Sequence, residues 1–205
     1  MPYNDDVGDF MEHQFESLIN NIKQYTTSAI FAVVHNPNLG TDLLYVYTRG
    51  ASRKILVFDK TENLKPIAKL LYNIGAHTIN LSSIEVEEEY QRNGIGSSLM
   101  QLMLAHGDSL GATNLYGMAK PINNIKGITI VGKDCMQEEL CAIKQFYCAN
   151  GCTFDEETDI YADEYDFSQS WQGGEKVKDL DDNLLEFACQ ILSKEQTLTH
   201  KPKTL

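Results

Sequence analysis

Apolar residues in the first third of the chain follow first a helical and then a strand-like period. Residues 6–25 place their apolar side chains on one helical stripe and predict an N-terminal helix. Three short β-rich runs follow at 29–34, 43–48 and 54–58, separated by segments that contain Asn, Pro, Gly and Ser. Because these residues favour turns, the runs predict an antiparallel meander. Residues 66–74 predict a further strand that leads into the next element.

The central pattern, in residues 78–111, is a strand, a glycine loop and an amphipathic helix. The strand is predicted by a run of apolar, mostly β-branched residues, namely Ile79, Leu81, Ile84 and Val86. The helix is predicted by residues that fall on one face at the 3.6 period, namely Ile95, Leu99, Leu102, Met103, His106 and Leu110. Gly111 follows as the expected left-handed end of this helix.

The loop between strand and helix has the features of an anion site. Gly94 and Gly96 permit backbone conformations that a side chain would hinder, and they leave the first amides of the helix uncovered. Free N–H groups at the positive end of a helix dipole favour a phosphate or diphosphate. A P-loop is excluded because no lysine follows Gly96, and a dinucleotide fingerprint is excluded because Leu99 stands where its third glycine would be.

The rest of the chain predicts alternating elements and a helical end. A strand at 113–118 is expected to pair in parallel with the central strand through a right-handed crossover. The segments that follow are predicted as a loop, a helix and one or two strands, at 119–136, 138–150 and 154–167. An amphipathic helix is predicted at 177–192, as a cap on the sheet or as an oligomer contact. We therefore expect one domain over residues 1–170 and a helical appendage with a polar tail over 171–205.

Composition narrows the range of partners. The chain has 205 residues and a formal net charge of −12, which disfavours nucleic acid and anionic membranes because both bind basic surfaces. No run approaches the ~20 apolar residues of a membrane span, and the acidic start lacks a signal-peptide pattern, so a cytoplasmic protein is expected. Five cysteines without a Cys-x-x-Cys pair indicate reduced thiols and no metal site.

The chain carries two motifs, at 86–96 and 146–151. In the first, Gln91-Arg92-Asn93-Gly94-Ile95-Gly96 follows a strand that ends at Val86, and in the second, Phe146-Tyr147 is followed by Gly151. Both resemble the GNAT family of acyl-CoA-dependent N-acetyltransferases: the first resembles its signature Gln/Arg-x-x-Gly-x-Gly/Ala, and the second a later helix-to-strand element, although Leu140 stands where the family often has Asn. The resemblance, over about residues 53–167, implies an α/β fold with a mixed, largely antiparallel sheet flanked by helices, to which the C-terminal helix is an addition.

The resemblance also implies a function and a binding site. The implied reaction is direct transfer of an acetyl group from acetyl-CoA to a primary amine, without a metal. The implied diphosphate site lies on the loop residues Gln91, Arg92, Asn93, Gly94, Ile95, Gly96 and Ser97, and the pantetheine arm would pair with the backbone of Ile84 and Val86. The alternative is that the two glycines only make a tight turn.

The base that deprotonates the amine is left open by the sequence. A neutral amine at pH 7 costs on the order of 4.6 kcal/mol unless a base or desolvation helps. Asn80 stands where some family members have a glutamate. Glu85 is the nearest carboxylate, but strand alternation sets it opposite Ile84 and Val86 unless a bulge turns it. His77, or a base that acts through water, is also possible.

Tyr147 is the candidate acid, because the family places its proton donor at this tyrosine; the alternative is a core tyrosine. Two further functions stay open: a non-catalytic acyl-CoA-binding or protein-interaction module, and a covalent route through Cys148. Acidic residues at 87–89 and 155–166 are either a solvated surface or a rim that selects a cationic acceptor such as a polyamine or a lysine-rich peptide.

Overall fold

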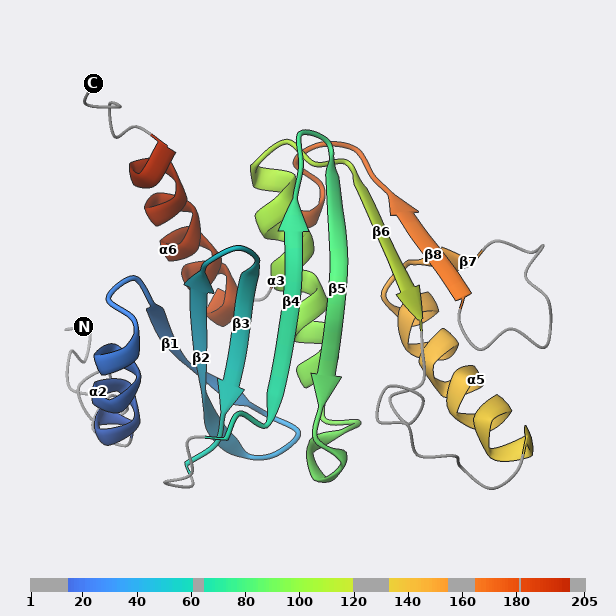
Figure 1. The fold of residues 1–205 in the computed structure, drawn as a ribbon, viewed down its shortest axis with the longest axis horizontal. Coiled ribbons are helices and arrows are strands. Elements are labelled where there is room, and N and C mark those ends of the chain that lie inside the picture. The colour runs from blue at the N-terminus through green and yellow to red at the C-terminus, as the bar shows by residue number, and fades with distance from the viewer. Residues whose placement is uncertain (1–14, 61–64, 120–132, 155–164, 181, 200–205) are drawn as a thin grey trace, which may run out of the picture.

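The protein folds around one twisted eight-stranded sheet with helices on both faces (Figure 1). A computed structural model describes residues 15–60, 65–119, 133–154, 165–180 and 182–199. The strand order is β1-β2-β3-β4-β5-β6-β8-β7. In chain order the strands are β1 Ile30–Asn36, β2 Thr41–Arg49, β3 Arg53–Phe58, β4 Ala68–Ile74, β5 Thr78–Val86, β6 Asn114–Ala119, β7 Thr153–Phe154 and β8 Tyr165–Ser170.

The sheet has the mixed, largely antiparallel topology that the sequence predicts. Strands β1 to β5 form an antiparallel meander, as expected from their short runs and turns. β5 and β6 pair in parallel, and β6, β8 and β7 continue antiparallel. The crossover between β5 and β6 is helix α3, Ile95–Ser109, which follows the short 3-10 turn η1, Glu88–Tyr90.

Two apolar layers hold the helices on the sheet. The larger one lies between the sheet and α3, and it also takes side chains from α5, Lys133–Ala149, and α6, Asp182–Thr199. The smaller one lies on the other face, under helix α2, Glu16–Tyr25. The N-terminal helix predicted over 6–25 is thus confirmed in its second half, and its first half lies outside the described residues.

The end of the chain differs from the prediction in one respect. The expected single helix over 177–192 is wrong at its start, because the chain first makes the 3-10 turn η2, Lys176–Asp179, and α6 begins after it. The helix is interrupted at Leu180, whose backbone is extended with a ψ of 139°. Before the turn, the buried carboxylate of Asp108 on α3 accepts the backbone N–H groups of Gly174 at 2.7 Å and Lys176 at 2.9 Å. These two bonds hold the segment before α6 on the end of α3.

Helix α6 caps the sheet and is anchored by a buried charge. Glu195 is 3% exposed and accepts a hydrogen bond from the Tyr47 hydroxyl at 2.5 Å. Arg49 and Arg53 on the β2–β3 hairpin approach the same carboxylate, with nitrogen–oxygen distances of 2.7 Å and 3.3 Å. We call Glu195, Tyr47, Arg49 and Arg53 the polar anchor.

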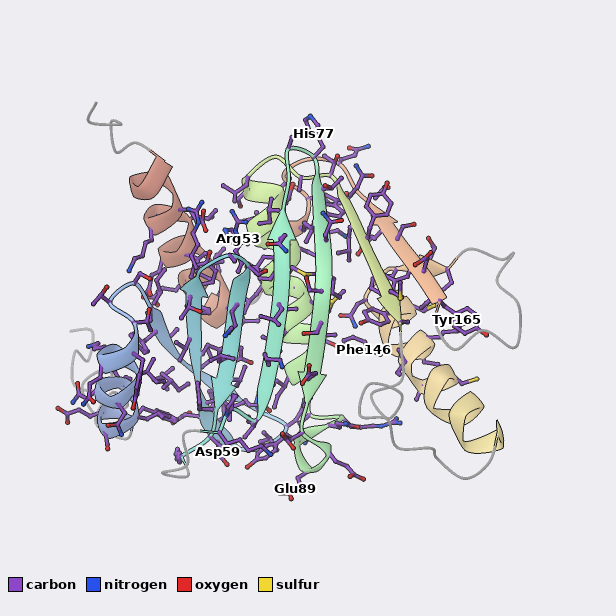
Figure 2. The ribbon with its side chains drawn as sticks, in the orientation of Figure 1. Arg53, Asp59, His77, Glu89, Phe146 and Tyr165 are labelled. Carbon is purple, nitrogen blue, oxygen red and sulfur yellow. The ribbon has the colours of Figure 1, made fainter. Side chains whose placement is uncertain are left out.

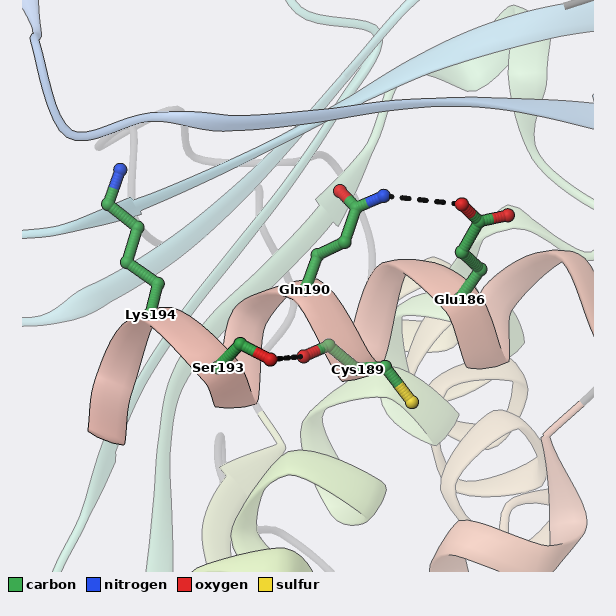
Figure 3. Close-up of a pocket in the computed structure, with 5 residues that line it drawn as sticks. All are labelled: Glu186, Cys189, Gln190, Ser193 and Lys194. Carbon is green, nitrogen blue, oxygen red and sulfur yellow. Dashed lines mark hydrogen bonds between the residues drawn. The ribbon is translucent and has the colours of Figure 1, made fainter. Parts of the chain in front are cut away.

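The other side of α6 is exposed. Its residues line a shallow surface depression, in which Glu186 accepts a hydrogen bond of 3.5 Å from Gln190 (Figure 3). Among the helices that the structure describes, none is long and apolar enough to span a bilayer.

Candidate functional site

The glycine loop between η1 and α3 has the backbone of an anion cup. Arg92 and Gly94 both have left-handed conformations, with φ of 64° and 80°, which turn the chain sharply into α3. The first bond into the helix is donated by Ser98 to the Gly94 carbonyl at 2.9 Å. Within the described part of the chain, the N–H groups of residues 92–97 donate no hydrogen bond. The residues present therefore fit a diphosphate, which needs such free donors at a helix start.

The two glycines of the loop serve different purposes. Gly94 is required by its positive φ. Gly96 is required by a close approach, because a Cβ there would lie 3.0 Å from the Phe146 ring and 3.8 Å from Val86. Phe146 comes from α5, so the loop motif and the Phe-Tyr motif meet in space (Figure 2).

Three side chains hold the loop in place. The Tyr90 hydroxyl donates to the carboxylate of Asp59 at the end of β3, and this bond, with partial burial, raises the pKa of Tyr90 to about 12. Gln91 donates to the Val86 carbonyl at 3.1 Å. Asn36 donates to a loop carbonyl from the β1–β2 turn. The sequence does not predict the roles of Asn36 and Asp59, because they belong to no motif and lie 57 and 31 residues from their partners, Asn93 and Tyr90.

Strands β5 and β6 separate just before the loop. They pair only at Thr78–Asn80 with Asn114–Tyr116, while β5 continues along β4 as far as Val86 (Figure 1). Glu87 donates its N–H toward the β4 side, to Ile67, at 2.9 Å. Because backbone groups alternate in direction along a strand, those of Ile84 and Val86 point toward the gap beside β6. An extended chain can pair with this edge as a further strand would.

A β-bulge decides which side chains face the helix. The register between β4 and β5 shifts at Ser82, which is the extra residue. Leu81 before the bulge and Ile84 and Val86 after it therefore all contact the core beneath α3. If alternation ran unbroken from Leu81, Glu85 and not Ile84 would face this core. The bulge thus sets Ile84 and Val86 on the core face, and ordinary alternation leaves Glu85 between them on the opposite face, as the sequence predicts.

Glu85 is an exposed, paired carboxylate. Its side chain is 47% exposed, and it forms an ion pair of 3.1 Å with Lys69, its cross-strand partner on β4. His77 is exposed in the β4–β5 turn, at the other end of β5 from Glu89 and the glycine loop (Figure 2). Neither geometry identifies a base, and the catalytic role of Glu85 stays a prediction.

Tyr147 lies in an aromatic cluster on the inner side of α5. Its ring stacks on Phe167 of β8 with centroids 4.0 Å apart, and it also contacts Phe146 and Phe154 edge-on. Burial raises the pKa of Tyr147, so the phenol stays protonated at neutral pH. Near the same end of α5, Asn150 lies 3.5 Å from the hydroxyl of Ser97 at the start of α3.

Other candidates lie apart from this arrangement or outside the described residues. Cys148 is a free, exposed thiol on α5. The side chain of Leu140 and the acidic run at 155–164 are not among the described parts. In the described ranges, no group of three or more His, Cys, Asp or Glu side chains could hold a metal ion.

Comparison with known proteins gives a family and a fold. The sequence model of the Acetyltransferase (GNAT) family matches residues 21–124, which include the β5–loop–α3 segment. No curated protein matches the chain. A cAMP-binding acyltransferase from Mycobacterium smegmatis superimposes with a TM-score of 0.57 at 14% identity, over 96% of this chain and 65% of that one. The chain thus spans about two thirds of that protein.

Two further solved structures are similar over smaller parts. An acetyltransferase of the GNAT family from Staphylococcus aureus Mu50 has a TM-score of 0.43 at 11% identity, over 59% of this chain and 68% of that one. The ribosomal-protein-S18-alanine N-acetyltransferase from Escherichia coli has a TM-score of 0.41 at 17% identity, over 62% of this chain and 75% of that one. At these identities the likeness concerns the fold alone.

Proposed function

Because this chain belongs to the GNAT family of acetyltransferases, we propose that it transfers the acetyl group of acetyl-CoA to a primary amine. The transfer is direct, in a ternary complex of protein, acetyl-CoA and amine. The observation that carries this proposal is the cup of amides at residues 92–97, which donate to no acceptor in the described part of the chain, next to the edge of β5 that diverges from β6. A diphosphate and an extended pantetheine arm are the two parts of acetyl-CoA that would occupy them.

The loop and the strand edge divide the binding between them. The N–H groups from Arg92 to Ser97 donate to the diphosphate oxygens, and the exposed Arg92 side chain adds positive charge. The backbone of Ile84 and Val86 pairs with the pantetheine amides, and the Val86 carbonyl accepts there in place of the exposed Gln91 side chain that it binds in the free protein. Held there, acetyl-CoA supplies a thioester whose carbonyl carbon is open to attack by an amine. The Glu85 side chain lies on the opposite face of β5 from Ile84 and Val86, where it pairs with Lys69.

The remaining steps are moving the amine proton and stabilising the departing thiolate. We assign the second to Tyr147, as a hydrogen-bond donor to the sulfur. A thiol has a pKa of ~8.5, and the raised pKa of Tyr147 makes complete proton transfer from its phenol to a thiolate less favourable than transfer from an ordinary phenol. Tyr147 therefore suits hydrogen bonding better than full protonation of the sulfur. The amine proton leaves through water or through a carboxylate such as Glu85, and an acceptor with positive charge suits the acidic chain.

The test begins with binding. We expect saturable binding of acetyl-CoA by calorimetry, and weaker binding by Gly94→Ala because alanine disfavours a φ of 80° by about 1–2 kcal/mol. Gly111→Ala is the matched control: Gly111 has a φ of 88°, has open space around its Cβ position and lies at the far end of α3. It should cost similar stability and leave acetyl-CoA affinity unchanged. A wild-type protein without saturable binding would refute the proposal.

Activity is then measured on a panel of small amines, polyamines and lysine-containing peptides. The acetylated product should be detected by mass spectrometry, because the exposed Cys141, Cys148 and Cys189 would react with a thiol reagent intended for released CoA. Product formation that depends on acetyl-CoA supports the enzyme. Tight binding without transfer to any amine would instead favour the non-catalytic acyl-CoA-binding module.

A further inference from the structure

The turn between β1 and β2 reaches the glycine loop through one side chain. Asn36, the last residue of β1, is 8% exposed. Its Oδ1 accepts the backbone N–H groups of Asn38 and Leu39, each at 3.0 Å, which closes the turn. Its Nδ2 donates to the carbonyl of Asn93 at 3.0 Å. One buried amide therefore joins two segments that are 57 residues apart.

The carbonyl that Asn36 holds lies at a critical point of the loop. Asn93 is flanked by Arg92 and Gly94, the two residues with left-handed backbone. The peptide bond between Asn93 and Gly94 is planar and trans, so its C=O and N–H groups point in opposite directions. Fixing the carbonyl toward Asn36 therefore fixes the Gly94 N–H in the opposite direction, away from the turn.

From this geometry, we propose that Asn36 is a positioning residue for acetyl-CoA, which sets the direction of the Gly94 N–H before the diphosphate binds. This inference depends on the proposed function. A loop that is already ordered loses less conformational entropy on binding than one that must be ordered by its ligand. Asn36 does not contact the ligand, and its effect passes through the backbone of Asn93.

The variant that tests the proposal is Asn36→Ser. A serine hydroxyl can still accept the turn N–H bonds, but it is too short to reach the Asn93 carbonyl. We expect the Kd for acetyl-CoA to rise about 5- to 10-fold, the usual effect of one neutral hydrogen bond. The kcat at saturating acetyl-CoA should stay within about twofold of wild type, because the reacting atoms are held by other residues.

Two comparisons separate positioning from a general structural defect. S-acetylpantetheine lacks the diphosphate, so its rate should be the same in wild type and Asn36→Ser. Gly40→Ala strains the same turn, because Gly40 has a φ of 63°, but it keeps the Asn36 side chain and has nothing within 4 Å of its Cβ position, so it should bind acetyl-CoA like wild type. If Asn36→Ser folds poorly, Asn36→Thr keeps a hydroxyl acceptor in a residue that favours strands, again cannot reach Asn93, and should show the same change in Kd.

The outcomes are distinct. No binding of acetyl-CoA by wild type would refute the proposed function and this inference together. Binding by wild type with an unchanged Kd in Asn36→Ser and Asn36→Thr would overturn only the role of Asn36. Equal losses with acetyl-CoA and S-acetylpantetheine, or an equal effect of Gly40→Ala, would overturn it as well, because the defect would then not be specific to the diphosphate loop.

Discussion

Replacing Glu195 by alanine should weaken the packing of the C-terminal helix on the sheet and destabilise the fold. The side chain of Glu195 is buried, and three groups depend on it: the Tyr47 hydroxyl at 2.5 Å and the guanidinium groups of Arg49 and Arg53. The Arg53 side chain is only 15% exposed, so it would lose its partner without gaining much water. The Arg49 side chain is 36% exposed and would be solvated more easily.

The size of the effect follows from these exposures. Breaking a buried ion pair by removing one partner costs about 3–5 kcal/mol, because the other charge stays buried. Since Arg49 can turn to solvent, we take the lower end, about 3 kcal/mol. For a chain of this size, that corresponds to a fall in Tm of about 6–12 °C.

The pH dependence gives a second, independent expectation. Burial alone would raise the pKa of Glu195, but the Tyr47 hydrogen bond and the two arginines outweigh it and hold the pKa below its usual value of 4.5. A carboxylate with a lowered pKa in the folded state contributes its full stability above its unfolded pKa. The difference between wild type and Glu195→Ala should therefore be constant from pH 7 to about 5 and shrink as the pH falls further.

The assay is urea unfolding followed by circular dichroism, at several pH values. Glu186→Ala is the matched control, because Glu186 is an exposed carboxylate on the same helix, and it should change the free energy of unfolding by less than about 0.5 kcal/mol. If Glu195→Ala is no more destabilising than Glu186→Ala, or if its effect does not change with pH, the reasoning on the polar anchor is wrong.

Three further predictions concern buried groups. Burial, with nearby Arg53, lowers the pKa of His106 from 6.5 to about 4. The unfolded chain therefore binds this proton at a higher pH than the folded protein, and about 3 kcal/mol of stability should be lost as the pH falls from 6.5 to 4. His106→Gln should flatten this pH dependence of the free energy of unfolding in urea titrations. Gly107→Ala should destabilise by about 1–3 kcal/mol in urea although alanine favours helices, because its Cβ would lie 2.3 Å from Ile79; an unchanged midpoint would contradict this. Tyr147→Phe should lower kcat at least tenfold in the product assay and leave the Kd for acetyl-CoA unchanged, and equal loss of both would indicate a structural role.

Much of the fold could be predicted because its signals are local. The runs that became β1 to β5 carry strand residues between turn residues, and the helical period of α3 spans its full length. The start of α6 could not be predicted in this way. Val177 and Leu180 fit the helical period of that helix, but the backbone is extended at Leu180 and separates a 3-10 turn from α6. Asp108, far away in sequence, holds the chain before this turn through the N–H groups of Gly174 and Lys176.

The candidate site was predictable in its backbone and less so in its side chains. Gly94 and Gly96 indicate the loop because glycine is required there by backbone geometry and close contact. Alternation predicts that Glu85 lies opposite Ile84 and Val86, but the bulge at Ser82, which sets Leu81 and Ile84 on the same face, is not visible in the sequence. The contact of Asn36 with the loop could not be predicted, because asparagine is common near turns and nothing in the sequence indicates that its side chain reaches Asn93.

The sequence by itself determined the strand, loop and helix order around Gly94, since this order depends on neighbouring residues and on the steric freedom of glycine. The tertiary structure alone decided what holds that segment: Asn36 under the loop, Phe146 against Gly96, and Glu195 between the arginines of a distant hairpin. The physical reason is that such contacts join residues 50 or more positions apart, and their energies depend on distance and burial, which no local spacing records.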